Sequence, residues 1–124
     1  MYESGENYLE TILILEEKIG SVRSIDVARE LNLSKPSVSR AVGLLKDDGY
    51  ITVSEEGFLK LTEKGREKAV SIYEKHKILT EFLIKVTGAP DDIAEKDACR
   101  IEHIISRETY QGIKKYLNKE DTLT

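Results

Sequence analysis

Apolar residues recur at helical spacing along most of this chain, and the period changes to that of β-strands only once. Residues 5–18 carry apolar side chains at mostly helical intervals, which predicts a first amphipathic helix. A short helix is expected over residues 24–31, with Ser24 as its N-cap. Ser34 is expected to cap a third helix, and Pro36 suits its first turn because the missing N–H removes no helical hydrogen bond there.

The spacing that follows the third helix predicts a hairpin. Two β-rich runs, residues 50–53 and 58–61, are separated by a four-residue turn, which is typical of two paired strands. A long helix is then expected from about residue 63 to 86. Gly88 and Pro90 break it.

The last part of the chain is also predicted to be helical. Asp91 is expected to cap a helix through Ile105, and Ser106 to cap a last helix that ends near Asn118, before a frayed tail. The predicted fold class is therefore mainly α with a small β-hairpin. Helix, short helix, tight turn, helix and hairpin follow each other in the order of a winged helix-turn-helix. A length of 124 residues suits one compact unit or two small cooperating ones.

Composition and charge narrow the class of protein. The chain has no run of about 18 apolar residues, and its N-terminus lacks the features of a signal peptide, so a cytoplasmic protein without a membrane partner is expected. One cysteine cannot form an internal disulfide, which agrees with a reducing compartment. The net charge is −4, but residues 23–46 hold five basic residues against two acidic ones, a local charge of +3. Such a basic segment on an acidic chain is expected where a single face meets phosphate.

Residues 24–31 and 34–46 fit the two helices of the helix-turn-helix, the second being the recognition helix. The N-terminal residues of a recognition helix enter the major groove of double-stranded DNA. The expected DNA-contacting residues are Ser34, Lys35, Pro36, Ser37, Ser39 and Arg40. The wing turn carries Glu55 and Glu56, which suit phosphate badly, so the wing is expected to contribute little. A helical domain that uses the same fold to bind protein stays an alternative.

Cys99, Glu102 and His103 gather the only cysteine and one of the two histidines of the chain. Spacings of i, i+3 and i+4 place three side chains on one stripe of a helix. Thiolate, carboxylate and imidazole together suit a transition-metal ion of borderline softness. The alternative is that Cys99 is a small buried apolar residue and the Glu–His pair an ordinary surface pair.

Four short segments stand in a distinctive order and spacing. They are Glu6-Asn-Tyr-Leu-Glu10, Ser34-Lys-Pro-Ser-Val-Ser-Arg40, Lys75-His-Lys-Ile-Leu79 and Asp97-Ala-Cys-Arg-Ile-Glu-His103. Together they resemble the diphtheria-toxin-repressor family, and more closely its short manganese-transport-regulator branch. The resemblance implies a homodimeric, metal-dependent DNA-binding regulator that represses metal-uptake genes. It implies a winged helix-turn-helix domain in residues 1–70 and a helical metal-binding and dimerisation domain in residues 71–124.

Residue by residue, the resemblance implies six metal-ligand positions. They are Asn7, Glu10, His76, Cys99, Glu102 and His103. The manganese branch has carboxylates at the positions of Asn7 and Cys99, whereas the iron branch has a methionine and a cysteine there and no acid at the position of Glu10. The chain is thus a hybrid of the two branches. Fe²⁺ or Mn²⁺ is the expected cofactor, with Co²⁺, Ni²⁺ or Zn²⁺ able to bind in vitro.

One principal ion is expected, held by the three clustered residues with help from Glu10 or Asn7. The additional site of the iron branch falls on His76, Thr80 and Glu95, and a threonine is a poor ligand. The expected ligands on the first helix and on the later helices belong to different packing units, so a bound ion would fix the placement of these units. It would thereby set the spacing of the two recognition helices of a dimer. A dimer binds two DNA half-sites that lie about 34 Å apart. Metal and DNA would then strengthen each other's binding by the same factor.

A homodimer is also expected from the apolar residues after position 70, which exceed what one small subunit can cover. They are Ile78, Leu79, Phe82, Leu83, Ile104 and Ile105. A metal-independent winged-helix regulator and a thiol redox sensor that uses Cys99 remain alternatives. An enzyme is not favoured, because no set of nucleophile, base and orienting group is recognised, and no small-molecule substrate is expected.

Overall fold

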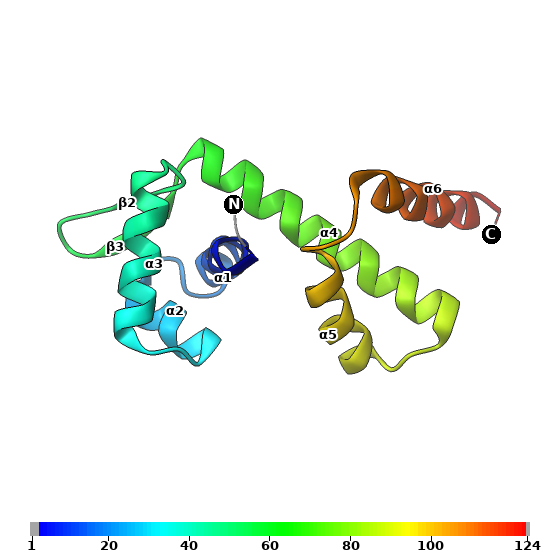
Figure 1. The fold of residues 1–124 in the computed structure, drawn as a ribbon, viewed down its shortest axis with the longest axis horizontal. Coiled ribbons are helices and arrows are strands. Elements are labelled where there is room, and N and C mark those ends of the chain that lie inside the picture. The colour runs from blue at the N-terminus through cyan, green and yellow to red at the C-terminus, as the bar shows by residue number, and fades with distance from the viewer. Residues whose placement is uncertain (1–2, 124) are drawn as a thin grey trace. The chain divides into compact units, whose positions relative to one another are not determined.

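The computed structural model describes residues 3–123, and the side-chain environments of residues 4–119. In chain order the elements are α1 (Glu3–Ile19), β1 (Val22–Arg23), α2 (Ser24–Leu31), α3 (Lys35–Asp47), β2 (Ile51–Val53), β3 (Phe58–Leu61), α4 (Glu63–Thr87), α5 (Asp91–Ile101) and α6 (Arg107–Leu123) (Figure 1). They fall into two compact units, unit 1 (Met1–Ser71) and unit 2 (Ile72–Thr124). None of the described helices combines the length and the hydrophobicity that a membrane crossing requires. The mainly helical fold with a small sheet confirms the predicted fold class.

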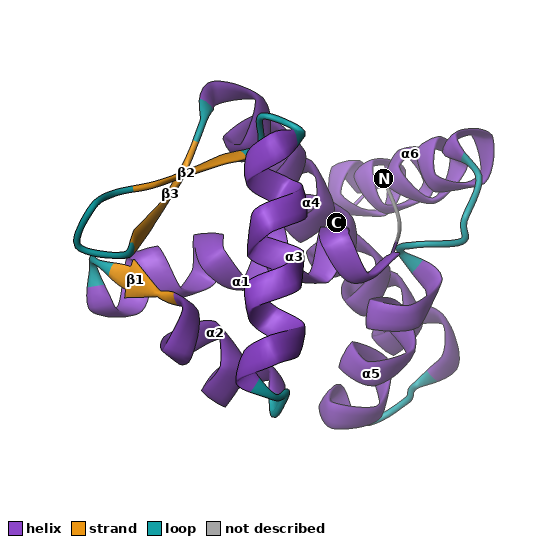
Figure 2. Cartoon of the chain, turned by 60° about the vertical axis from the view of Figure 1, so that its left-hand side comes forward, coloured by secondary structure: helices purple, strands orange, loops and turns teal. Residues whose placement is uncertain are grey.

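Unit 1 packs α1, α2 and α3 together beside a small sheet (Figure 2). The amphipathic face of α1 is buried as its repeat predicts, with Leu9 and Ile12 inaccessible to solvent. Val27 of α2 and Val38 of α3 meet this face from the other helices, and Ile51 closes the core from the sheet. Burial of one side of α3 fixes its orientation, so its other side stays exposed.

The two helices of the helix-turn-helix begin differently. Ser34 is the N-cap of α3 as predicted, and its Oγ accepts a hydrogen bond from the N–H of Ser37 at 3.3 Å. The N-cap of α2, however, is Arg23 and not Ser24, which is the first residue of the helix. The backbone N–H of Arg23 donates to Oδ2 of Asp26 at 2.8 Å. The cap moves back by one residue because Arg23 is already extended as the end of a strand.

The predicted hairpin is present, and a third strand that the sequence did not predict joins it. The sheet is antiparallel with the order β1-β3-β2. Val22 lies opposite Leu59, and Arg23 lies opposite Phe58. Two residues are too few to show the alternation by which a strand is recognised in a sequence. Only the pairing with β3, which is distant along the chain, creates β1.

Unit 2 contains the second part of α4 together with α5 and α6. The N-cap of α5 is Pro90 rather than Asp91, and the helix ends at Ile101, about one turn before the predicted end. Helix α6 continues to Leu123, beyond its predicted end, so most of the tail expected to fray is helical. Thr124, the last residue of that tail, lies outside the described residues.

Polar and aromatic contacts join α6 to α4 within unit 2. Nζ of Lys114 donates to Oε1 of Glu74 at 2.7 Å, and the rings of Phe82 and Tyr116 meet edge to face with centroids 6.1 Å apart. The hydrogen bond that Lys114 donates to Glu74 raises the pKa of Lys114, and burial raises the pKa of Tyr110. At neutral pH Lys114 is therefore a cation and Tyr110 is a neutral phenol.

One residue expected to be left for a partner subunit is instead part of the core of unit 2. Leu79 is 1% exposed, so it is already covered within a single subunit and is not available to a partner. Ile104 is 79% exposed, as a residue available to a partner should be. Four other residues of that predicted set are half-buried: Ile78, Phe82, Leu83 and Ile105.

Gly65→Ala is expected to destabilise the protein, although alanine is normally the better helix former. A Cβ atom at Gly65 would overlap the carbonyl oxygen of Tyr50 and lie 2.9 Å from its carbonyl carbon. That oxygen is held by the N–H of Thr62 at 3.0 Å, so the backbone cannot move away freely. Overpacking of this kind should lower the free energy of unfolding by about 1 to 3 kcal/mol in chemical denaturation.

The matched control is Gly43→Ala in α3. No described atom lies within 4 Å of a Cβ at Gly43, so alanine should leave stability unchanged or raise it by about 0.5 to 1 kcal/mol. Equal stability of wild type and Gly65→Ala would contradict the close approach of α4 to Tyr50.

Candidate functional site

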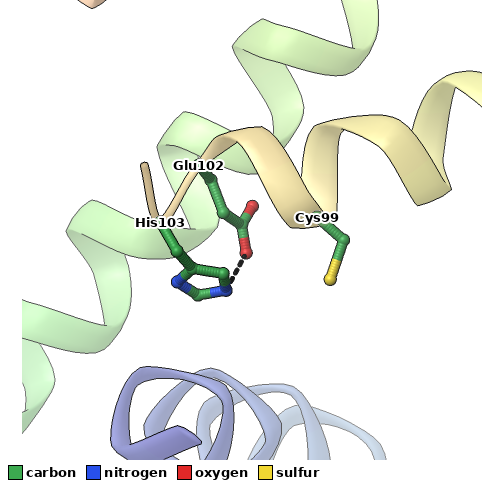
Figure 3. Close-up of side chains that lie close together, drawn as sticks. All are labelled: Cys99, Glu102 and His103. Atoms are coloured by element: carbon green, nitrogen blue, oxygen red, sulfur yellow. Dashed lines mark ion pairs between the residues drawn. The ribbon is translucent and has the colours of Figure 1, made fainter. Parts of the chain in front are cut away.

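Three potential metal ligands come together at the C-terminal end of α5. Ligand atoms of Cys99, Glu102 and His103 all lie within 4.8 Å of one another. Figure 3 shows the three side chains on one side of the ribbon, with the carboxylate between the thiol and the imidazole. Sequence spacing anticipated this grouping, because neighbours three and four positions apart lie side by side on a helix.

The backbone around the cluster is not one continuous helix, which corrects the prediction of a helix through Ile105. Glu102 is the C-cap residue of α5, with helical φ and ψ of −56° and −26°, so it still follows the helical stripe. His103 belongs to the turn that follows, and its N–H reaches the carbonyl of Arg100 at 3.4 Å. The imidazole is thus placed by a tightened last turn and not by α5 itself.

Glu102 is a carboxylate enclosed by protein. Its side chain has no exposed surface, and the side chain of His103 is 2% exposed. Oε2 of Glu102 lies 3.1 Å from Nδ1 of His76, and Oε1 lies 3.4 Å from Nε2 of His103. Among the described residues, none donates a hydrogen bond to Oε1.

A buried carboxylate oxygen without a hydrogen bond is costly unless a positive charge compensates it. A cation bound between Glu102, Cys99 and His103 would supply that charge. The donor set of sulfur, oxygen and nitrogen suits Fe²⁺, Co²⁺ or Zn²⁺ better than a hard ion bound only by oxygen atoms. The residues present therefore fit a transition-metal ion on both electrostatic and chemical grounds.

The remaining predicted ligands stand in two places. His76 of α4 contacts the cluster directly through the carboxylate of Glu102. Asn7 and Glu10 lie on α1, three positions apart and thus on one face of that helix, and both side chains are half-buried. They belong to unit 1, whereas the other candidates belong to unit 2.

A separate hollow lies beside His76 in unit 2. It has a volume of about 360 Å³, and its lining includes His76, Thr80 and Glu95, the positions of the additional site of the iron branch. The hydroxyl of Thr80 donates to the backbone carbonyl of His76 at 2.7 Å, so its hydrogen is directed at the helix. Neutral Thr80 remains a weak partner for a cation.

The predicted DNA-contacting residues form the exposed start of α3. Ser34, Lys35, Pro36, Ser37, Ser39 and Arg40 are all exposed. Val38, between them, is buried and anchors this turn of the helix to the core of unit 1. The exposed residues are small, polar or basic, and the first turn of α3 has no acidic residue, so the surface can approach phosphate and base edges.

One basic residue near the hairpin was missed by reasoning from the sequence. Cζ of Arg23 lies 4.3 Å from the centroid of the Phe58 ring, beside the wing turn. Its contribution to the local positive charge was visible in the sequence, but its position depends on the pairing of β1 with β3.

Both units match known sequence families. Residues 1–59 match the N-terminal DNA-binding domain of iron-dependent repressors, and residues 62–122 match the iron-dependent repressor metal-binding and dimerisation domain. These matches agree with the resemblance drawn from the four segments. The chain is also 31% identical to the diphtheria toxin repressor of Corynebacterium diphtheriae.

The chain is also similar to individual proteins. The chain is 34% identical over 122 residues to the iron-dependent repressor IdeR of Mycobacterium tuberculosis, a match that covers 98% of this chain and 53% of IdeR. It is 32% identical over 120 residues to an uncharacterised HTH-type transcriptional regulator of Methanocaldococcus jannaschii, and that match covers 96% of each. The solved structure of the manganese regulator SloR matches with a TM-score of 0.82 and 28% identity, over 92% of this chain and 53% of SloR. The chain thus spans about half the length of IdeR and SloR.

Proposed function

This chain belongs to the iron-dependent repressor family, and we propose that it is a transcriptional repressor whose binding to DNA is activated by a divalent transition metal. The observation that carries the proposal is the cluster of a thiol, a carboxylate and an imidazole within 4.8 Å around a buried carboxylate. It stands in a chain whose unit 1 presents an exposed, polar and basic helix in a winged helix-turn-helix. Function is assigned from these two sites, since a fold alone does not establish it.

The ligands at the centre of the proposed metal site are Cys99, Glu102 and His103. His76 holds one carboxylate oxygen of Glu102, and such a partner fixes the direction of a ligand and can join the metal itself. Asn7 and Glu10 complete the proposed ligand set on the strength of the family resemblance. A bound ion supplies the positive charge that the buried carboxylate requires.

Iron is the metal that the ligand chemistry favours over manganese. A thiolate is a soft ligand and binds Fe²⁺ better than Mn²⁺, which prefers oxygen. The relatives divide between the two metals, since IdeR is named for iron and SloR for manganese. Cys99 therefore carries the choice of metal in this proposal.

DNA is the proposed partner, and its contacts are assigned to the start of α3. Lys35 and Arg40 can bind phosphate or guanine, and the serines can reach bases or phosphate. The exposed N-terminal turn of α3 has the geometry with which recognition helices enter the major groove. A DNA-binding repressor acts where the genome is, so we place the protein in the cytoplasm, without an enzymatic role.

Metal and DNA binding are linked in this proposal. If the ion increases DNA affinity by some factor, DNA must increase metal affinity by the same factor, and such couplings are typically about 1 to 3 kcal/mol. The linkage gives a test that does not depend on knowing the regulated genes.

Fluorescence anisotropy of duplexes selected from a random-sequence pool tests the function. Affinity should be measured with Fe²⁺ under anaerobic conditions, with Mn²⁺, Co²⁺ and Zn²⁺, and with a chelator. We expect tight binding with a metal and at least about fivefold weaker binding in chelator, the lower end of common couplings. Equal affinity in chelator would replace the proposal by a metal-independent winged-helix regulator.

A homodimer formed through unit 2 is part of the proposal. An apolar groove between α4 and α6 is lined by Phe82, Val86, Ile113 and Tyr116, with Thr109 and Gly112, and has a volume of about 450 Å³. Val86 and Tyr116 are about half exposed, at 52% and 46%. A second copy of the chain would cover these apolar side chains, as in the two-fold dimers that most soluble oligomers form.

Val86→Lys is expected to weaken the dimer at least tenfold in sedimentation equilibrium, because it buries a charge in an apolar contact. Val70→Lys is the matched control, since Val70 is a similarly exposed valine of α4 (46%) in unit 1. A wild-type monomer at micromolar concentration, with and without metal, would remove the dimer from the proposal.

A further inference from the structure

We propose that Arg23 is a contact to the DNA backbone, held in place by the aromatic ring of Phe58 beside the wing turn. The inference rests on the proposed function and adds a contact outside α3. It also revises the expectation that the wing region, with Glu55 and Glu56 in its turn, contributes little to DNA binding.

Three observations place the guanidinium of Arg23 at the turn of the wing. Arg23 lies opposite Phe58 in the register of β1 with β3. Its Cζ atom is 4.3 Å from the centroid of the Phe58 ring, a cation–π contact. Its Nη1 atom is 3.9 Å from where a Cβ on Gly57 would be, and Gly57 is the last residue of the turn. The cation is therefore held where β2 and β3 connect.

The ring contact leaves the donors of this side chain available. A guanidinium carries its N–H groups in its own plane, so stacking one face on a ring leaves its edge free. Arg23 is an exposed residue, and no described carboxylate forms an ion pair with its guanidinium. A planar, positioned and unpaired guanidinium suits the two oxygens of a phosphate, which arginine binds with two parallel hydrogen bonds.

Arg23 also connects two elements that run beside the DNA backbone in this fold. It is the N-cap residue of α2, the helix that crosses the backbone in a helix-turn-helix. At the same time it adjoins the wing through Phe58. Figure 1 shows the wing loop and α3 on the same side of unit 1, and Figure 2 shows β1 next to that loop. A duplex that lies along α3 can thus reach Arg23.

Charge in the wing explains why such a residue is needed. Glu55 and Glu56 are exposed in the turn and would repel phosphate. Arg23 and Lys60 are the nearby cations, and Lys60 follows Phe58 by two positions on β3, so it points to the same face of the sheet. The guanidinium is nearest to the turn through Gly57 and offsets the two glutamates where the backbone would pass.

Arg23→Ala tests the contact in the metal-loaded full-length chain. Anisotropy should show a dissociation constant about tenfold higher, the order expected for one hydrogen bond to a charged group. The loss should be the same on the selected duplex and on an unrelated one, and the slope of log affinity against log salt should fall by about one for each phosphate contact removed. Arg107→Ala, an exposed arginine of unit 2, is the control with the same charge change and should keep both values.

Two further variants separate a phosphate contact from a structural role. Arg23→Lys keeps the charge and should keep the wild-type salt slope, with a smaller loss of affinity. Phe58→Leu keeps Arg23 but removes the ring that holds it, and should weaken DNA binding about two- to fivefold. Thermal melting of each variant identifies any that fails to fold.

The proposal is overturned if Arg23→Ala is folded and binds DNA with the affinity and salt slope of wild type. It is also overturned if affinity falls while the salt slope is unchanged, since Arg23 would then only support the wing. Both results leave metal-activated binding by wild type intact. Failure of the proposed function would instead appear as equal binding of wild type in metal and in chelator.

Discussion

Metal-activated DNA binding is expected to disappear in Glu102→Gln. This substitution keeps the shape of the side chain but removes the charge that a cation would neutralise, and the side chain has no exposed surface through which water could compensate. Loss of a single outer partner of a metal ligand already costs about 10- to 100-fold in metal affinity, so loss of this ligand should cost at least about 100-fold. Isothermal titration calorimetry with Co²⁺ and Fe²⁺ measures the metal affinity of this variant and of wild type.

The control for Glu102→Gln is Asp92→Asn, which removes an exposed carboxylate from the same helix. It should keep the metal affinity and the metal-activated DNA binding of wild type. Unchanged metal affinity in Glu102→Gln would mean that the buried carboxylate serves only its contact with His76, and the cluster would not be the metal site.

Substitutions of Cys99 should show which metal the same cluster selects. Cys99→Asp adds a hard oxygen ligand and should move the preference from Fe²⁺, Co²⁺ or Zn²⁺ toward Mn²⁺. Cys99→Ser should weaken binding of the softer ions without that gain. If Cys99→Ser leaves both metal affinity and metal-activated DNA binding unchanged, the thiol is only a packing group. Glu10 and His76 would then become the principal ligands and manganese the preferred metal.

Lys35→Ala and Arg40→Ala are expected to weaken DNA binding while leaving metal affinity unchanged. Both residues are exposed in the first turns of α3, the part of a recognition helix that enters the groove. A residue that contacts phosphate should lower affinity for all duplexes and reduce the salt slope by about one. A residue that contacts a base should instead relax specificity at one position by about 1 to 3 kcal/mol. Fluorescence anisotropy with duplexes that differ from the selected sequence at a single base pair distinguishes a phosphate contact from a base contact.

Lys46→Ala is the matched control for these two variants. Lys46 is an exposed cation in the last turn of the same helix, so it tests whether position on α3 or charge alone matters. It should have the smaller effect on affinity and none on specificity. Wild-type DNA binding by both Lys35→Ala and Arg40→Ala would exclude α3 as the reading helix and favour a protein partner for the fold.

Predictions from the sequence were most accurate where the structure depends on neighbours along the chain. The apolar repeat located the first helices, and residues that cap or break a helix located the later ones. The side chain of Ser34 capped α3 because its partner is only three residues away. The cluster of Cys99, Glu102 and His103 could be predicted for the same reason, since spacing within one turn places their ligand atoms together. Errors at these elements were confined to their ends, where one residue can replace another as the cap.

The sequence alone thus determined the helices, the order of a winged helix-turn-helix, the exposed start of α3 and the grouping of three ligands. Tertiary structure decided the rest, because it depends on residues far apart along the chain. Pairing with β3 created β1 and brought Arg23 to the ring of Phe58. Packing within unit 2 placed His76 against Glu102. The folded chain also buried Leu79, which the hydrophobic pattern assigned to a partner. A repeat shows which residues are apolar, whereas only the packed fold determines which surface covers them.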